Sequence, residues 1–141
     1  MAAQENKAAA RRLVLEVFRD DALSLIDELV AHDYVDHSLP PDVPPNREGL
    51  RQAVGAMRRA FPDLSYTIEN EVAEGDLVAQ RLVAKGTLRG EFMGMPATGK
   101  SAVWQEMHLH RFNSDGELAE HWGTNDDLGM LIQLGLAPSS N

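Results

Sequence analysis

The first sixty residues repeat apolar side chains at intervals of three and four, whereas residues 64–124 largely alternate apolar and polar side chains. The first spacing is that of an amphipathic helix and the second is that of a strand. The pattern predicts three helices, at 5–19, 20–31 and 46–60. Helical elements followed by strands are typical of an α+β fold, with the helices packed on a curved antiparallel sheet of about four strands.

Two hairpins are expected in the β half. The first spans 64–90 and turns at Glu74-Gly75-Asp76, and the second spans 103–124 and turns at Asn113-Ser114-Asp115-Gly116. Acidic residues followed by glycine are common at such turns. A short helix is predicted from Asp126-Asp127 to Gly135, because the acids can cap its start and glycine suits the position after its end.

The second hairpin carries the densest chemistry of the chain. Strand alternation places Trp104, Glu106, His108 and His110 on one face of its first strand. By the same parity, one face of the returning strand carries Leu118, Glu120, Trp122 and Thr124, and then Asp126 if the strand reaches that far. One wall would thus carry imidazoles, carboxylates and two indoles. The alternative is a half-solvated sheet surface whose His–Glu pairs only stabilise the hairpin.

Composition narrows the classes of partner. The 141 residues fit one domain, 1–141, and the formal net charge of −9 argues against nucleic acid and anionic membranes. Cysteine is absent, which excludes disulfides and thiol nucleophiles. Neither a signal peptide nor an apolar run of membrane-spanning length is visible, so we expect a cytoplasmic protein.

Several segments together resemble a known family. They are YVDH (34–37), AFPDL with AEGDLVAQR (within 60–81), GTLRGEFMGMPATGK (86–100), MHLHRF (107–112), ELAEHW (117–122) and DDLGMLIQLG (126–135). In this order they are similar to the SnoaL-like polyketide cyclase and ester cyclase group of the NTF2-like superfamily. The resemblance implies a cone-shaped fold, in which a helix layer and a strongly curved sheet enclose a pocket for a hydrophobic small molecule. It also implies chemistry without cofactor or metal.

The resemblance further implies roles for individual residues. Asp126, at the W-x-x-x-D position, would act as general acid and base, with His108 of M-H-x-x-R-F as its partner; Asp127 is the alternative acid. Asp126 could instead be only a helix cap. A metal held by His108 and His110 with Glu106 or Asp126 is less favoured, because their spacing on a strand is a weak metal signal. The remaining candidates for contact with substrate are Tyr34, His37, Arg81, Phe92, Met95, Trp104, Glu106, His110 and Trp122.

A carboxylate in an apolar cavity has a raised pKa and becomes a better base near neutrality. The expected reaction is therefore an intramolecular aldol closure of a polyketide-type substrate. Two alternatives stay open: an isomerase or epoxide hydrolase, the latter needing Arg81 beside Asp126, and a binding module without turnover. We also expect a homo-oligomer, a dimer or tetramer, that covers the sheet face bearing Val103, Met107 and Leu109.

Overall fold

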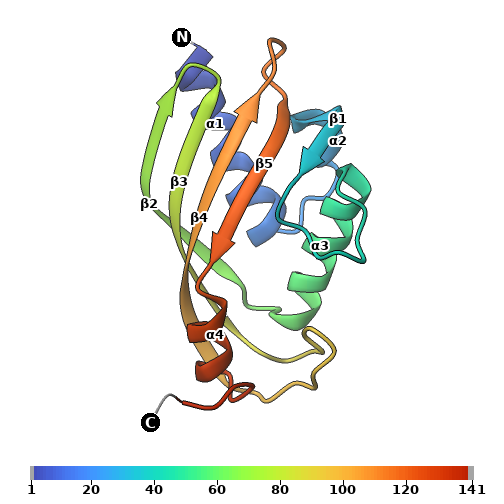
Figure 1. Cartoon of the computed structure of the whole chain (residues 1–141), viewed down its shortest axis with the longest axis vertical. Helices are drawn as coiled ribbons and strands as arrows, with labels where there is room; N and C mark the ends of the chain where they lie inside the picture. Colours follow the sequence, from blue (N-terminus) through green and yellow to red (C-terminus); the bar gives the residue numbers. More distant parts are fainter. Residues whose placement is uncertain (1, 140–141) are drawn as a thin grey trace.

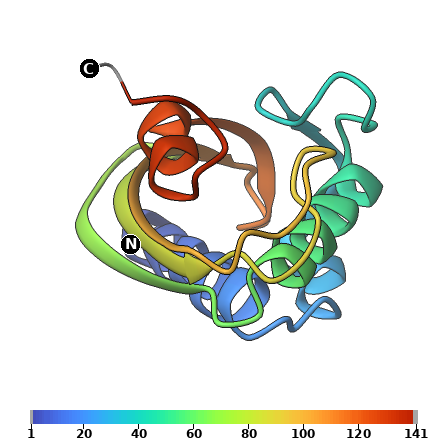
Figure 2. The ribbon, with the colours of Figure 1, turned by 90° about the horizontal axis from the view of Figure 1, so that it is seen from below.

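The computed structural model describes residues 2–139 and contains one strongly curved sheet with strand order β1-β5-β4-β3-β2 (Figure 1). In chain order the elements are α1 (Ala2–Arg12), η1 (Leu13–Arg19), α2 (Leu25–Leu29), β1 (Val30–Asp36), α3 (Arg47–Ala60), β2 (Ser65–Glu74), β3 (Leu77–Thr87), β4 (Ser101–Phe112), β5 (Leu118–Asn125) and α4 (Asp127–Gln133). Seen from below, the strands curl around a central space, and α1, η1 and α3 close the side that the strands leave open (Figure 2). The α+β cone expected from the sequence is confirmed.

Strands β2 to β5 form the antiparallel meander that the alternation predicted. The prediction missed β1, which pairs in parallel with β5 through Val35 opposite Glu120 and Asp36 opposite His121. The sheet is therefore mixed and has five strands. The helix predicted over 20–31 is wrong at both ends, because α2 begins only at Leu25 and the chain is extended from Val30 onward. The partner of β1 lies more than eighty residues away, so local periodicity carries no sign of this pairing.

A β-bulge sets which residues of β5 face inward. Phe112 is paired with Leu118, but the preceding Arg111 is paired with Glu120, so Ala119 is an extra residue in β5. Both Leu118 and Ala119 are buried. A bulge of this kind shifts the alternation by one residue. Beyond it His121 faces the inside of the cone and Trp122 faces outward, the reverse of the parity expected from the sequence.

The core consists of two apolar clusters on the inner face. One joins η1, α2, β1 and α3 to the turn end of the second hairpin, and includes Val17, Ile26, Val54 and Phe112. The other lies toward α4 and includes Phe61, Leu82, Trp104 and Met130. Between them on β4 lie Glu106, His108 and His110, so polar side chains separate the two clusters along that strand.

Two helices begin at the caps that the sequence predicted. Asn46 caps α3 by accepting a hydrogen bond from the Gly49 amide at 3.1 Å, and Asp126 caps α4 by accepting one from Gly129 at 3.0 Å. Gly135 follows α4 with φ of +76°, a conformation that favours glycine. Among residues 2–139, no helix is long and apolar enough to cross a membrane.

Candidate functional site

A buried layer of polar side chains crosses the inner face of the sheet, and every strand contributes to it. Its members are Asp36 from β1, Glu71 from β2, Gln80 from β3, Glu106, His108 and His110 from β4, and His121 from β5. Buried polar groups are costly unless they are hydrogen-bonded. The hydrogen bonds among these side chains therefore show how the candidate site is built.

Four of these side chains form a continuous hydrogen-bonded chain. Glu106 Oε1 lies 2.8 Å from His108 Nε2, and His108 Nδ1 lies 2.8 Å from His121 Nε2. His121 Nδ1 then lies 3.0 Å from Asp36 Oδ1. Two imidazoles in direct contact are thus held between two carboxylates. The sequence prediction included His108 and Glu106 but missed His121 and Asp36, because the bulge at Ala119 and strand β1 were not recognised.

Both carboxylates of this chain have further donors. The Trp104 indole donates to Glu106 Oε2 at 2.8 Å, while the Tyr34 hydroxyl donates to Asp36 Oδ2. Burial alone would raise the pKa of Asp36, but hydrogen bonds and positive charge from His121, with the hydroxyls of Tyr34 and Ser38, hold it well below the ordinary value. Burial, together with the nearby Asp36 charge, raises the pKa of Tyr34 far above its ordinary value. Asp36 is therefore ionised and Tyr34 is a permanent donor.

His110 lies behind the chain and is neutral. Its ring stacks on His121 and His108, with centroids 5.1 and 6.0 Å apart. Nε2 lies 3.0 Å from the side-chain carbonyl of Gln80, and Nδ1 is the one buried side-chain nitrogen or oxygen of residues 2–139 without a hydrogen-bond partner. Burial, and then the neighbouring His121 and His108, lower the pKa of His110 well below its ordinary value.

The two acids at the start of α4 lie at the far end of this wall. Asn125 is opposite Glu106, and the Asp126 amide donates to the carbonyl of Gln105 at 3.0 Å. The Asp126 carboxylate caps α4 and is exposed. Partial burial, with the negative charges of Glu106 and Asp126, raises the pKa of Asp127. Asp127 is thus the acid that the negative charge of Glu106 affects, while Asp126 accepts the hydrogen bond that caps α4.

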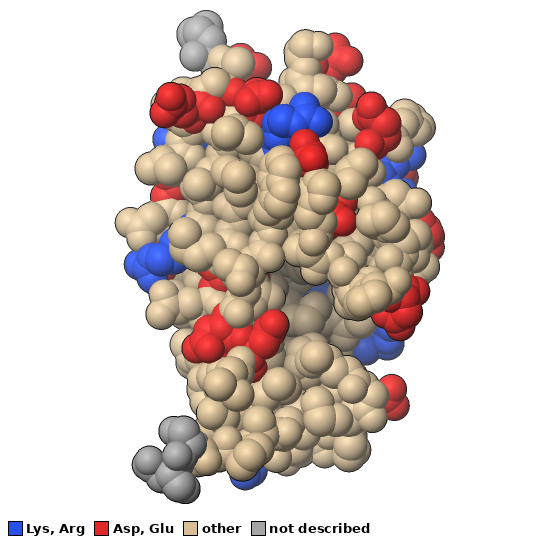
Figure 3. Space-filling view, in the orientation of Figure 1, with Lys and Arg blue, Asp and Glu red and all other residues tan. Residues whose placement is uncertain are grey.

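Of the four hydrogen-bonded side chains, the two imidazoles are the most exposed to solvent. The side chains of His108 and His121 are 16% and 13% exposed, compared with 6% for Glu106 and 1% for Asp36. Figure 3 shows a hollow on the face beside the end of β5, between α4 and α3, with acidic side chains on its border near α4.

Three predicted contact residues lie outside the cone. Trp122 is opposite Leu109 on the outer face and stacks on His37, with ring centroids 5.0 Å apart and an interplanar angle of 11°. Arg81 is paired with Met107 on the same outer face and donates to the amide oxygens of Asn70 and Gln105. Arg81 therefore cannot supply the Asp–Arg–Asp arrangement that epoxide opening was expected to require.

The remaining predicted contacts are on the inner side or in the loop after β3. Tyr34, Trp104, Glu106 and His110 are all buried on the inner wall. Phe92 and Met95 face each other in a tight turn, and Phe92 packs on Phe61 with centroids 5.3 Å apart. This loop is anchored where the amides of Arg89 and Gly90 donate to the carbonyl of Ala60, beside α3 (Figure 2).

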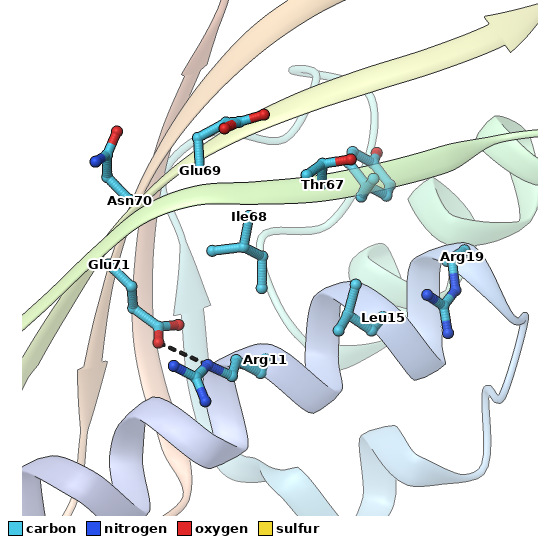
Figure 4. A pocket seen from close by; sticks show the side chains of 9 residues that line it. Arg11, Leu15, Arg19, Thr67, Ile68, Glu69, Asn70 and Glu71 are labelled. Carbon is cyan, nitrogen blue, oxygen red and sulfur yellow. Dashed lines mark hydrogen bonds and ion pairs between the residues drawn. The ribbon is translucent and has the colours of Figure 1, made fainter.

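A separate groove of about 570 Å³ lies between the first helix and the edge strand β2 (Figure 4). It is lined by Arg11, Leu15, Arg19 and residues 66–71, and the Arg11–Glu71 ion pair crosses it at 2.7 Å. None of the site residues predicted from the sequence lines it. We place the site at the histidine chain because the ionisable groups that can exchange protons are joined there.

The ring nitrogens of His108 and His121 all contact other protein side chains. Residues 2–139 contain no group of three His, Cys, Asp or Glu side chains arranged to hold a metal ion. The fold and this inner wall together define an NTF2-like α+β cone with an acid–imidazole site. The sequence matches the SnoaL-like polyketide cyclase family over residues 8–134, and the chain belongs to that family.

Three relatives illustrate the match. The chain is 29% identical over 127 residues to the aklanonic acid methyl ester cyclase DauD of Streptomyces sp. (strain C5), covering 88% of this chain and 78% of that protein. It is 30% identical over 112 residues to the nogalonic acid methyl ester cyclase of Streptomyces nogalater, covering 78% and 83%. The crystal structure of IdmH from Streptomyces antibioticus aligns with a TM-score of 0.79 at 36% identity, covering 92% and 98%.

Proposed function

We propose that this protein is a cofactor-independent cyclase that closes a ring in a hydrophobic polyketide-type substrate by intramolecular aldol addition. Membership of the SnoaL-like family supports this proposal, as do two relatives named as cyclases of polyketide methyl esters. The single observation that carries it is the meeting of carboxylates and imidazoles on the inner wall of the cone.

Asp126 is the proposed base. It removes a proton from the carbon next to a carbonyl, and the resulting enolate carbon forms a bond to the carbon of a second carbonyl group. The π bond of that second carbonyl breaks, and its oxygen receives a proton from the site. Substrate and product contain the same atoms, so the reaction needs no oxidant or reductant. Among residues 2–139, Asp126 Oδ2 has no hydrogen-bond partner, which leaves it available to a substrate.

His108 is the proposed partner of Asp126. The Asp126 amide bonds to Gln105, three residues from His108 along β4, which is roughly 10 Å of strand. This spacing leaves room for the reacting atoms between carboxylate and imidazole. The bonds from His108 to Glu106 and His121 fix its ring, and such positioning contributes to catalysis. Phe92 and Met95 would contact the apolar part of the substrate, with Trp104 packed deeper in the wall.

We further propose that two copies pair through the outer face of the sheet. An apolar row crosses four strands there, from Val72 through Ala79 and Leu109 to Trp122. Val72 in this row and Met107 beside it are 66% and 49% exposed. Exposed apolar surface of this extent commonly marks an interface.

The test of the base is Asp126→Asn, with Asp127→Asn as the matched control. Asparagine keeps the capping oxygen but cannot accept the substrate proton. We expect cyclisation of an aklanonic-type methyl ester to fall by roughly 10²–10⁴-fold in Asp126→Asn, with little change in melting temperature. Asp127→Asn should retain most activity. A large loss in Asp127→Asn alone would assign the base to Asp127, and full activity in both variants would refute the proposed mechanism.

A further inference from the structure

The chain from Glu106 to Asp36 contains three hydrogen bonds in series, and each needs one proton. Suppose that both carboxylates are ionised and both imidazoles are neutral. Each imidazole then carries a single N–H, and two protons must serve three bonds. Either the His108–His121 contact or one of the carboxylate contacts would bring two lone pairs together at 2.8–3.0 Å, which is repulsive.

A third proton removes this conflict. With Asp36 ionised by its several donors, the proton of the last bond stays on His121 Nδ1. The remaining two protons can satisfy the first two bonds only if one imidazole is protonated or Glu106 is a neutral acid. These arrangements differ by the movement of a proton along bonds of 2.8 Å. Glu106 Oε2 already accepts a hydrogen bond from the Trp104 indole, so this oxygen is satisfied without a proton of its own.

We propose that His108 and His121 share one proton, so that a single imidazolium is held between the carboxylates of Glu106 and Asp36 as a fixed positive charge on the inner wall of the cone. Asp36 and His121 are then positioning residues for His108. The shared proton itself does not depend on the proposed function. Its catalytic effect does, because the imidazolium would stabilise the negative oxygen of the enolate. The substrate class follows from it: compounds whose reactive form is an enolate, such as 1,3-dicarbonyl esters.

The surroundings of the pair support a positive charge there. The titratable groups that face it are Glu106 and His110 from β4, and Asp36 and Tyr34 from β1, with Asp127 of α4 acting on Glu106. His110 is neutral and Tyr34 keeps its proton, as their pKa directions require. One imidazolium thus lies among carboxylates, and no Lys or Arg of residues 2–139 forms a hydrogen bond or ion pair with the hydrogen-bonded residues from Glu106 to Asp36. Glu71 and Arg11 pair with each other beyond Gln80.

The variant that isolates this proton is His121→Gln. A glutamine amide can donate to His108 Nδ1, and a neutral His108 can still donate from Nε2 to Glu106. The variant therefore keeps the bond to His108 but removes the need for a third proton. His32→Gln is the control, because His32 lies on β1, is exposed, and contacts Arg47 instead of the hydrogen-bonded residues from Glu106 to Asp36.

The experiment is ¹⁵N NMR of the five histidines at pH 7.5 in the full chain. We expect the wild-type protein and His32→Gln to show one imidazolium shared by His108 and His121, with a downfield, exchange-protected proton between the rings. His121→Gln should lose both signals and leave His108 neutral. Two neutral rings in the wild-type protein, or an imidazolium that persists on His108 in His121→Gln, would overturn the proposal. The wild-type spectrum decides the matter even if His121→Gln fails to fold.

Kinetics separate this inference from the proposed function. With an enolisable ester substrate, His121→Gln should lower kcat by roughly 10- to 100-fold while KM changes little, because electrostatic stabilisation acts mainly in the transition state. If Asp126→Asn is fully active but the shared proton is observed, the proposed base is wrong and the imidazolium stands. If Asp126→Asn is inactive and no shared proton is found, the reverse holds.

Discussion

Gly123 lies directly opposite His108 across the β4–β5 ladder, and a Cβ at Gly123 would stand 2.9 Å from His108 Nδ1. That nitrogen is the one bonded to His121. The absence of a side chain at position 123 is therefore what allows the two imidazoles to meet. Hydrogen bonds hold both ring nitrogens of His108, so a movement of the ring away from an added Cβ would strain or break at least one of these bonds.

The first prediction concerns this glycine. Gly123→Ala should push His108 away from His121, lower cyclisation at least about tenfold, and remove the shared-proton signal. The backbone at this position has an ordinary strand conformation, so we expect the melting temperature to fall by only a few degrees. Thr124→Ala, one residue further on and facing outward, is the control and should behave like the wild-type protein. Unchanged activity in Gly123→Ala would mean that the contact is not needed.

A second prediction concerns acid stability. His110 has a lowered pKa in the folded protein, so below pH about 6.5 the unfolded chain binds a proton that the folded protein does not. The free energy of unfolding should therefore decrease as pH falls below this value, by at most about 1.4 kcal/mol per pH unit for this one group. Urea unfolding between pH 7.5 and 5 measures it. The slope should be smaller in His110→Gln; equal slopes would show that folding does not lower the pKa of His110.

Asp36 predicts a further loss at lower pH. Its pKa is lowered in the folded protein, so its contribution to stability is complete above the ordinary aspartate pKa, about 3.9, and is lost as pH falls through the folded value. Asp36→Asn should lessen the decline in the free energy of unfolding below pH 4, while being less stable than the wild-type protein at pH 7. A decline of the same size in both proteins would contradict the inferred ionisation of Asp36.

The fourth prediction tests the outer face. Light scattering at micromolar concentration should give at least twice the chain mass, and Met107→Glu should yield a monomer, because it places a charge beside the apolar row. Leu128→Glu is the control: Leu128 is 65% exposed but lies on α4, away from the row. A wild-type monomer would refute the pairing, and an oligomer that survives Met107→Glu would move it to another surface.

The sequence predicted most elements of the fold because their signals are local. Asn46 and Asp126 cap the helices that they were expected to cap, and the alternation along β4 correctly separates Trp104, Glu106, His108 and His110 from the outer residues. Side chains on one strand keep their relation whatever the rest of the chain does. The face of β4 that carries the candidate chemistry was therefore predictable.

The partners of that face were not predictable in the same way. Asp36 reaches His121 only because β1 joins β5 in parallel, a long-range pairing with no local pattern. His121 faces inward, and Trp122 outward against His37, because one extra residue in β5 reverses the alternation. Bulges depend on how two strands fit together, so the composition of either strand alone does not reveal them.

Ala119 has a consequence that reaches beyond its own side chain. The side chains of β5 alternate regularly on either side of Ala119, but the alternation shifts by one residue there. This shift decides whether an imidazole or an indole faces the interior. If β5 paired with β4 in regular alternation from Leu118 with Ala119 retained, Trp122 would take the inward place of His121, whereas deleting Ala119 would remove the bulge and keep His121 inward. The chemistry of this wall therefore depends on the bulge in β5 as much as on the identity of the residues that follow it.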